Sequence, residues 1–396
     1  MKITFVTDTY SPQANGVATT LQRLVSGLRE REHHVDIVRP ATLACDEIGM
    51  EVPSASLPGY KEVKIGFPSG MLLRRRWSKI RPDVIYVATE TPLGASAIST
   101  ARTLDIPVAS GFHTDFPLYM EHYKVPILGQ AATRYLRHVH NRSDRTFVPS
   151  FDTIEKLQKQ GFENLELLPK GVDTKLFSPK RRDSSLRLKW GVPGDAPVGL
   201  YVGRIAREKN LPLIIRTFCH LRSRFPDFRG VLVGDGPLLE EYRAAHPEFI
   251  FAGVKFGEEL AAHYASADLF VFPSTTETFG NVTLEAMASG LSVLAFDYAA
   301  ARQHIVDGKS GFVVPFGEED HFVDRAVEAL NSPDSFEIRK KARIRARKVR
   351  WKKVVKDFEK SLIRMMEGEA VPESETRFTL FRENEFNTRE ENCKAL

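Results

Sequence analysis

The most informative stretch of this chain is residues 273–290. It reads Pro-Ser-Thr-Thr-Glu-Thr-Phe-Gly-Asn-Val-Thr-Leu-Glu-Ala-Met-Ala-Ser-Gly. The apolar residues 269–272 before them predict a buried strand, and the polar turn that follows carries Glu277. A helix is expected to open at about Gly280, with Glu285 a little over one turn inside it. One carboxylate is thus predicted in the loop above the strand, and the other on the helix behind it.

The turn between these two glutamates suits a ligand that is part sugar and part phosphate. The helix N-terminus offers unpaired backbone N–H groups to an anion. Each carboxylate can accept hydrogen bonds from vicinal hydroxyl groups. A nucleotide sugar has both features, whereas the alternative is an ordinary strand-to-helix turn with two solvated glutamates. This stretch alone favours neither interpretation over the other.

On either side of this stretch, short apolar runs alternate with amphipathic stretches along almost the whole chain. Such a pattern indicates parallel sheets with helices on both faces. The expected strands are residues 3–7, 35–38, 84–88, 108–112, 146–148, 165–168, 198–202, 230–233, 249–252, 269–272, 292–296 and 311–314. The expected helices of the first half are residues 17–31, 93–104 and 130–142. Because the rhythm restarts in the second half, we predict an α/β fold of two Rossmann-like, doubly wound parallel-sheet domains that face a central cleft.

Domain boundaries are expected where polar and turn-forming residues gather. The predicted parts are a first domain over residues 1–172, a second over 173–349, a helix over about 350–366 that returns to the first domain, and a tail over 367–396. The linker is expected in residues 169–173 and 178–185. The tail is charged and lacks a clear period, so we expect it to be mobile.

The composition is that of an ordinary globular protein, with 42% hydrophobic and 27% charged residues. No apolar run approaches the roughly 18 residues that a membrane-spanning helix needs. The chain begins too soon with polar residues for a signal peptide, and Cys45, Cys219 and Cys393 lie far apart. These features predict a reduced, cytoplasmic protein without a disulfide framework or a thiolate metal site.

Three basic clusters underlie the net charge of +5. They lie within residues 74–81, 134–145 and 340–356, and the first two carry an aromatic residue, Trp77 or Tyr135. Basic residues beside an aromatic one are typical of a surface that touches anionic lipid, although solvated helix faces are more common. Nucleic acid is not expected as a partner, because no recognition helix, zinc-ligand spacing or aromatic RNA-binding signature accompanies the charge.

Two loops of the first half carry further candidate residues. Gly16 stands at the start of a helix after the first strand, where its backbone can approach a phosphate closely. His113 follows the expected strand over 108–112, with Asp115 and Tyr119 just beyond it. A histidine there can donate a hydrogen bond to a sugar hydroxyl or transfer a proton near neutral pH, and a capping role is the alternative.

A basic loop follows the first strand of the second half. Gly203 makes a tight turn, after which Arg204 and Lys209 can place two cations on a diphosphate. They would stabilise the charge that grows on a leaving group. Surface ion pairing with Glu208 is the alternative.

Two later turns are expected to line the same cleft. Gly234 lies in a second strand-to-helix turn, and Val254 and Lys255 follow the next strand, where their backbone can contact a base. No spacing of aspartates, histidines or cysteines predicts a metal site. Neither a metal nor another cofactor is therefore expected.

Taken together, these segments resemble the retaining glycosyltransferases of family 4, which have the two-domain GT-B fold. The similarity covers roughly residues 1–365, and its most specific element is the pair Glu277 and Glu285, with seven residues between them. The segment 111–116 with Tyr119 and Tyr123 is similar to the branch that transfers mannosyl, glucosyl or sulfoquinovosyl groups to lipids. One departure is Asn15 before Gly16, where many members have two glycines.

The resemblance implies roles for the matching residues. Arg204 and Lys209 would hold the donor diphosphate, and Glu285 the ribose hydroxyls. Glu277 would bind the sugar, together with the backbone of residues 279–282, and His113 would bind a hydroxyl of the transferred sugar. The catalytic set would be His113, Arg204, Lys209 and Glu277, and the acceptor would contact Asp115, Tyr119 and Tyr123. The donor-binding set would be Gly16, Gly203, Arg204, Lys209, Gly234, Val254, Lys255, Glu277, Phe279, Gly280, Asn281, Val282 and Glu285.

The same resemblance implies a peripheral membrane enzyme at the inner face of the cell membrane. It would move a hexosyl group from GDP-mannose or a UDP-hexose to a lipid such as diacylglycerol or a glycolipid. Retention without a nucleophile implies same-face substitution, in which the departing phosphate takes the acceptor's proton. Two alternatives remain: a soluble or polysaccharide acceptor, and a protein that binds nucleotide sugars without turnover.

Overall fold

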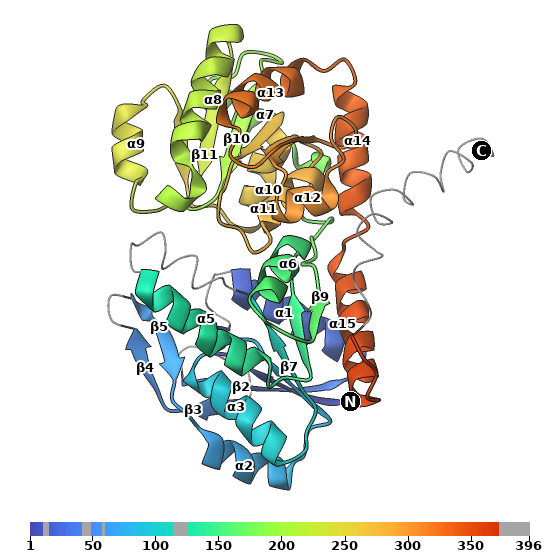
Figure 1. Ribbon diagram of the computed structural model, residues 1–396. Helices are drawn as coiled ribbons and strands as arrows, with labels where there is room; N and C mark the ends of the chain where they lie inside the picture. The colour runs from blue at the N-terminus through green and yellow to red at the C-terminus, as the bar shows by residue number, and fades with distance from the viewer. Residues whose placement is uncertain (11–15, 42–48, 58–59, 114–125, 372–396) are drawn as a thin grey trace, which may run out of the picture. The chain divides into compact units, whose positions relative to one another are not determined.

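The computed structural model describes residues 1–10, 16–41, 49–57, 60–113 and 126–371 (Figure 1). The chain divides into two compact units. Unit 1 consists of Met1–Lys170 with Trp351–Leu396, and unit 2 of Gly171–Arg350. The residues 114–125, with the expected acceptor contacts Asp115, Tyr119 and Tyr123, lie outside the described part, as does most of the expected tail.

Unit 1 is built on a seven-stranded parallel sheet in the order β3-β2-β1-β6-β7-β8-β9. Its strands are β1 (Lys2–Val6), β2 (His34–Pro40), β3 (Met50–Val52), β6 (Val84–Val87), β7 (Val108–Gly111), β8 (Arg145–Val148) and β9 (Leu165–Leu167). All four residues of β6 are buried, as expected for a strand covered on both faces. A separate antiparallel pair, β4 (Ser54–Leu57) and β5 (Tyr60–Gly66), was not predicted.

Helices pack against the sheet of unit 1 (Figure 1). They are α1 (Gly16–Arg29), α2 (Gly70–Lys79), α3 (Pro92–Thr103), α5 (Pro126–His140), α6 (Phe151–Lys159) and α15 (Trp351–Met366). Helix α15 lies against α1, although more than 300 residues of chain separate them. Gly27 allows this close contact, because a Cβ atom there would lie 2.6 Å from Cγ2 of Val355.

A buried polar network also holds α15 in unit 1. The Arg145 guanidinium donates to Glu166 Oε2 at 2.8 Å and to Ser361 Oγ at 2.9 Å. Arg145 is fully buried, so these bonds compensate the loss of its hydration. The ring of Phe358, on the same helix, contacts the ring of Tyr86 at a centroid distance of 5.1 Å.

Unit 2 is built on a six-stranded parallel sheet in the order β12-β11-β10-β13-β14-β15. Its strands are β10 (Val198–Val202), β11 (Arg229–Val233), β12 (Ile250–Gly253), β13 (Leu269–Phe272), β14 (Ser292–Phe296) and β15 (Phe312–Val314). Its helices are η1 (Pro179–Arg181), α7 (Ser184–Lys189), η2 (Arg207–Lys209), α8 (Leu211–Arg224), α9 (Leu239–Ala245), α10 (Gly257–Ser266), α11 (Asn281–Ala288), α12 (Ala299–His304), α13 (Glu319–Asn331) and α14 (Ser335–Ala346). The central strands β10 and β13 pair directly, which brings the loops after them together.

The prediction that residues 178–185 form a linker is wrong. This stretch lies inside unit 2 and contains η1 and the start of α7. Its polar residues cap helices rather than face a solvated hinge: the Asp183 carboxylate accepts from the backbone N–H groups of Ser185 and Leu186. Polar composition alone does not separate a capping segment from a flexible one.

The interpretation of Trp77 as a lipid-facing aromatic residue is also wrong. The Trp77 side chain is buried in the apolar core between α2 and the sheet of unit 1. Arg76, next to it, pairs with Asp36 at 2.8 Å. Arg74 and Arg75, by contrast, are exposed on α2. The basic cluster is therefore divided between a buried side and an outer side of one helix.

Candidate functional site

The loops that follow β10 and β13 bring a lysine and a glutamate together in unit 2. The Lys209 ammonium contacts Glu277 Oε1, to which the Ser274 hydroxyl also donates at 2.8 Å. Both charged side chains are mostly buried, with exposed fractions of 12% for Lys209 and 16% for Glu277. The attraction between a buried cation and a buried carboxylate in contact offsets part of the free-energy cost of removing both from water.

The backbone around Glu208 fixes the relative position of these two loops. Glu208 belongs to the short helix η2, and its carbonyl oxygen accepts from the Thr275 backbone N–H at 3.4 Å and from the Thr275 hydroxyl at 3.3 Å. Asn210 ends η2 in the left-handed conformation, with φ of 53°. Asparagine tolerates this conformation better than most residues, so the chain can turn sharply from η2 into α8.

Arg204 lies on the same loop but remains more accessible than Lys209. Its guanidinium is 3.3 Å from Glu208 Oε1, and its side chain is 44% exposed. The Tyr201 hydroxyl donates to the Arg204 carbonyl at 2.8 Å, which holds the turn in place. Pairing with Glu208 is thus present, as the alternative interpretation expected, and the exposed guanidinium still faces solvent.

Glycines let the β10 and β11 loops pack backbone against backbone. A Cβ atom at Gly234 would lie 1.9 Å from the Gly203 carbonyl oxygen, and the φ of Gly234 is +143°. A Cβ atom at Gly236 would lie 2.3 Å from the Ile205 carbonyl oxygen. Any side chain at either position would force the two loops apart.

Helix α11 begins directly after Gly280, whose φ of +87° suits glycine. The backbone N–H groups at its start are the ones that could meet an anion. Phe279 contributes only its backbone there, because its side chain is buried. The Tyr298 hydroxyl donates to the Glu277 carbonyl at 2.5 Å and so stabilises the turn that carries Glu277.

Glu285 lies on the first turns of α11, in a less polar setting than Glu277. Its Oε2 accepts a hydrogen bond from the Tyr264 hydroxyl at 3.0 Å. Burial raises the pKa of Glu285 to about 7, and the hydrogen bond from Tyr264 only partly opposes this rise. Glu285 therefore changes its charge near neutral pH.

The expected base-contacting residues lie at the end of β12. Val254 is exposed, and the Lys255 ammonium is 2.5 Å from Glu259 Oε1. No hydrogen bond given for the described residues links them to Lys209 or Glu277. Their contact with a base stays a prediction. It rests only on the order of the strands, in which β12 lies next to β11 and two strands from β10.

In unit 1, His113 lies at the end of β7 beside Tyr86 of β6. The Tyr86 hydroxyl is 2.7 Å from His113 Nε2. Burial raises the pKa of Tyr86, so the hydroxyl keeps its proton and can donate to Nε2. Gly111 is required for this pair, since a Cβ atom there would lie 2.2 Å from the Tyr86 oxygen.

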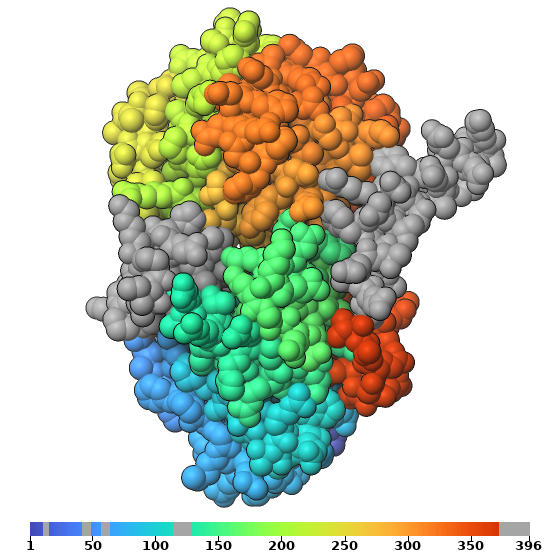
Figure 2. Space-filling view, viewed as in Figure 1, coloured from blue at the N-terminus to red at the C-terminus, as the bar shows by residue number. Residues whose placement is uncertain are grey.

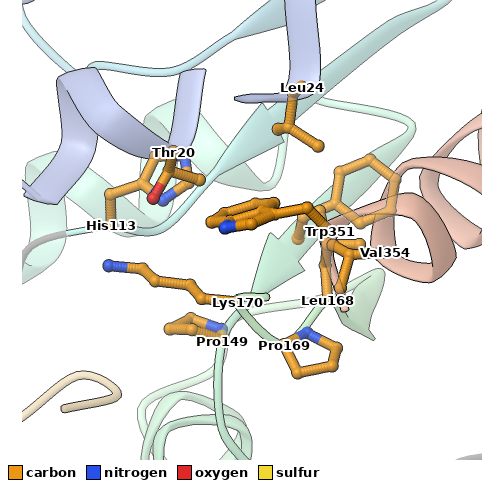
Figure 3. Close-up of a pocket in the computed structure, with 10 residues that line it drawn as sticks. Thr20, Leu24, His113, Pro149, Leu168, Pro169, Lys170, Trp351 and Val354 are labelled. Carbon is orange, nitrogen blue, oxygen red and sulfur yellow. The ribbon is translucent and has the colours of Figure 1, made fainter. Parts of the chain in front are cut away.

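His113 and the buried Lys170 are among the residues that line a small pocket of unit 1 (Figure 3). Lys170 extends beneath Trp351 towards the side of the pocket where His113 lies. Burial lowers the pKa of His113 to about 3, and the nearby charges of Lys170 and His140 act in the same direction. His113 is therefore neutral throughout the physiological range. Thr20 supplies a hydroxyl to the same pocket.

Gly16 begins α1, as expected, and a Cβ atom there would meet no atom of the described residues within 4 Å. Close packing among the described residues therefore does not explain a glycine at this position. The nearby Asp8, at the end of β1, accepts hydrogen bonds from the Thr89 hydroxyl at 2.6 Å and from the Gly66 backbone N–H at 2.5 Å. Asp8 thereby joins the main sheet to the antiparallel pair.

Several residues of these sites were not identified from the sequence. They are Ser274, Tyr264 and Tyr298 in unit 2, and Tyr86, Lys170 and Thr20 in unit 1. Ser274 stands in the turn that carries Glu277 and could have been proposed from its spacing to that residue. Tyr264, Tyr298 and Tyr86 contact their partners across 21 or more residues of sequence, which no local pattern reveals.

Two sequence-family models match this chain. One, described as Glycosyltransferase Family 4, matches residues 14–176, and the other, described as Glycosyl transferases group 1, matches residues 196–332. Each model thus covers most of one compact unit.

Three similar relatives have known activities by name. A GDP-mannose-dependent alpha-mannosyltransferase of Mycobacterium tuberculosis is 32% identical over 83% of this chain and 88% of the relative. Sulfoquinovosyl transferase SQD2 of Arabidopsis thaliana is 30% identical over 85% of this chain and 68% of the relative. Alpha-monoglucosyldiacylglycerol synthase of Acholeplasma laidlawii is 26% identical over 84% of this chain and 89% of the relative.

The fold is shared with solved glycosyltransferase structures. Sucrose-phosphate synthase from Thermosynechococcus elongatus has a TM-score of 0.74 at 19% identity, covering 93% of this chain and all of that one. Anabaena HepE in complex with UDP also has a TM-score of 0.74, at 20% identity, covering 91% of this chain and 99% of that one. At these identities the likeness establishes the fold, which is GT-B.

Proposed function

Because this chain belongs to the family 4 glycosyltransferases and is a sugar-transferring enzyme, we propose that it moves a hexosyl group from a nucleotide sugar to a membrane lipid, with retention of configuration. GDP-mannose is the donor to test first, since it is named for the mannosyltransferase that is 32% identical to this chain. A UDP-hexose is the next donor. The acceptor is a lipid such as diacylglycerol or a glycolipid, in line with the name of the monoglucosyldiacylglycerol synthase.

One observation carries the donor assignment: the contact of Lys209 with Glu277 at the ends of the adjacent strands β10 and β13. In the proposal, Lys209 binds the diphosphate and Glu277 accepts from hydroxyls of the sugar. Because the two side chains touch, a donor held by both would have its sugar and its diphosphate positioned together. This supports the proposal because catalysis by same-face substitution depends on such positioning.

Arg204 and the N-terminus of α11 complete the proposed phosphate site. Lys209 and Arg204 carry two positive charges, and Glu277 and Glu208, with which they pair, carry two negative ones. These four side chains therefore balance, and the backbone N–H groups that follow Gly280 supply the additional positive potential. The proposed contacts of residues 280–282 are of this kind. The N–H groups of Gly203 and Gly234 instead donate to the Val233 and Gly253 carbonyls, so these two glycines would contribute close approach of the backbone rather than donors.

The reaction we propose needs no protein base. The bond between the anomeric carbon and the diphosphate oxygen breaks, and the acceptor oxygen bonds to the same carbon from the same face. The acceptor proton passes to the departing phosphate oxygen. Lys209 and Arg204 stabilise the charge that grows on the diphosphate. His113 binds a hydroxyl of the transferred sugar, and the Tyr86 hydroxyl, 2.7 Å from Nε2, orients its ring.

The surface of α2 supports a membrane-bound acceptor. Its outer side carries Met71, which is 87% exposed, and Leu72, which is 44% exposed. Arg74, Arg75 and Lys79 are exposed beside them, and the segment containing α2 lies at the surface of unit 1 in Figure 2. Apolar and basic residues together on one exposed helix suit an anionic membrane surface. We place the enzyme peripherally at the inner face of the cell membrane, and among the described residues no helix has both the length and the apolar character to cross one.

The test is a panel of GDP-mannose, UDP-glucose and an acidic UDP-hexose, each with vesicles that contain diacylglycerol or a glycolipid. We expect one donor to be consumed with formation of an α-linked glycolipid, which nuclear magnetic resonance of the anomeric proton identifies. The matched control is Lys209→Ala. Donor consumption that requires only a soluble sugar acceptor would overturn the lipid assignment, and a β-linked product would overturn retention.

A further inference from the structure

Helix α14 carries the first part of the third basic cluster. Its cations, with Arg339 just before the cluster and Arg347 just after the helix, form two sets. One set points into unit 2 and caps other helices. Arg339 donates to the Gly290 carbonyl at 2.6 Å, Arg343 donates to the Ala288 carbonyl, and Arg345 donates to the His304 carbonyl at 2.7 Å. These carbonyls lie at the C-terminal ends of α11 and α12, where cations are stabilising. These three arginines therefore have a structural role.

The second set lies on the outer side of α14 with two exposed apolar residues. Phe336, Lys340 and Ile344 follow one another at intervals of four residues, so they lie on the same side of the helix. Phe336 is 74% exposed, Lys340 is 56% exposed and Ile344 is 39% exposed. Arg347, on the next turn, is exposed as well. We call these four residues the α14 surface.

The α14 surface is not needed to fold unit 2. The buried residues Ile338, Ala342 and Ala346 hold α14 against the core from its opposite side. Single exposed apolar residues are common on protein surfaces. Here, however, a phenylalanine and an isoleucine alternate with cations along one side of a helix that has ample buried contact elsewhere. Exposed cations with apolar side chains between them can contact both the phosphates and the acyl boundary of an anionic lipid surface.

We propose that the α14 surface is a second membrane contact, carried by the donor-binding unit and distinct from the α2 surface of unit 1. Three cations, Lys340, Lys341 and Arg347, outnumber the two carboxylates at this part of the helix. These are Glu337, which pairs with Lys340 at 3.3 Å, and the exposed Asp334 before the first turn. The excess positive charge selects an anionic partner, and the apolar side chains between the cations select the bilayer interface. This inference rests on the proposed function, because a lipid acceptor brings the whole enzyme to the membrane.

The experiment measures binding of the full chain to vesicles by flotation, with phosphatidylcholine alone or with added phosphatidylglycerol. The main variants are Lys340→Ala with Arg347→Ala, and Phe336→Ser with Ile344→Ser. Each cation near an anionic surface is worth about 1 kcal/mol, so removing two should weaken partitioning about 30-fold. The matched control is Leu188→Ser with Lys189→Ala on α7, where Leu188 is 74% exposed and no second apolar residue of the helix is exposed. This control should bind as the unchanged protein does.

A second measurement does not depend on weakened binding. Phe336→Trp should give fluorescence that shifts to shorter wavelength with anionic vesicles, whereas Leu188→Trp should not. Partitioning of the double variants within twofold of the unchanged protein, together with no shift for Phe336→Trp, would overturn the proposal. If the unchanged protein binds vesicles and only an Arg74→Ala with Arg75→Ala variant loses binding, the proposed function stands and this inference fails. If the unchanged protein binds no anionic vesicle, both fail, and binding to an acidic protein instead would assign the α14 surface to another partner.

Discussion

The two units differ in how they hold the polar groups at the ends of their central strands. In unit 2, Lys209 and Glu277 are charged groups in direct contact, and Arg204 pairs with Glu208. In unit 1, His113 and Tyr86 are neutral groups that share one hydrogen bond inside a mostly apolar pocket. The Lys209–Glu277 pair is therefore held by charge, whereas the His113–Tyr86 pair is held by a neutral hydrogen bond even though Lys170 lines the same pocket. This matches a donor whose diphosphate is charged and a transferred sugar whose hydroxyls are not.

The largest effect should come from removing a charge of unit 2. Replacing Lys209 with alanine takes away the cation that we assign to the leaving diphosphate. Turnover should then fall by about 100-fold to 1000-fold, as when one donor to a developing anion is lost. The measurement is release of nucleoside diphosphate at saturating donor and acceptor, with Lys189→Ala as a control at an exposed site. Near-normal turnover in both Lys209→Ala and Arg204→Ala would remove the charge-based half of the comparison.

The next effect concerns the backbone that positions these charges. Replacing Gly234 with alanine would bring a Cβ atom to 1.9 Å from the Gly203 carbonyl oxygen, at a φ of +143°. Overpacking and backbone strain together should lower the free energy of unfolding by about 3 kcal/mol. Gly308→Ala is the matched control, because φ is +66° there and no atom lies within 4 Å. Denaturant unfolding of both variants checks this, and equal losses would show that strain alone, not loop contact, matters.

A smaller effect is expected from the neutral histidine of unit 1. Replacing His113 with alanine removes one uncharged hydrogen bond, and turnover should fall about tenfold to 100-fold. Because the pKa of His113 is about 3, its ring does not gain a proton when the pH falls from 8 to about 5.5. The turnover number at saturating donor should therefore show no acidic limb from this residue. An acidic limb near pH 6 that disappears in His113→Gln would contradict a neutral site in unit 1.

The smallest expected effect is the pH dependence of donor binding, which depends on the raised pKa of Glu285 in unit 2. With a pKa of about 7, Glu285 is mostly protonated at pH 6 and mostly ionised at pH 8. In the proposed donor site the ionised form would accept hydrogen bonds from the ribose hydroxyls, so the dissociation constant of the donor should fall as pH rises. The expected change between those pH values is at most about tenfold. Titration calorimetry measures it, and Glu285→Gln should be insensitive to pH; an equal pH dependence in that variant would assign the effect to another group.

Much of the secondary structure could be predicted from local pattern. The expected strands 198–202 and 292–296 coincide with β10 and β14, and α11 starts one residue after the expected Gly280. Buried parallel strands are recognisable because each is a continuous apolar run between turn residues. The β4–β5 pair was not predicted, because it is short and only Gly66 among its described residues is buried. A pair with so few buried residues shows no clear apolar period.

The candidate residues were found more readily than their chemical states. Gly280, Glu277 and Glu285 were identified because the turn that carries them lies in one continuous stretch. That the Glu277 carboxylate contacts Lys209, 68 positions earlier, depends on the pairing of β10 with β13. That Glu285 titrates near neutral pH depends on its burial beside Tyr264.

Patterns among residues close together in the sequence were thus sufficient to predict the α/β class, the family and the identity of the charged loops. Apolar period and turn residues depend only on neighbours in the chain, so they can be read directly. Folding alone decided that Trp77 is buried, that Arg339, Arg343 and Arg345 cap helices, and that the outer side of α14 stays exposed. Burial and charge pairing are properties of residues that meet across long stretches of sequence, and a basic cluster looks the same in sequence whichever way its side chains point.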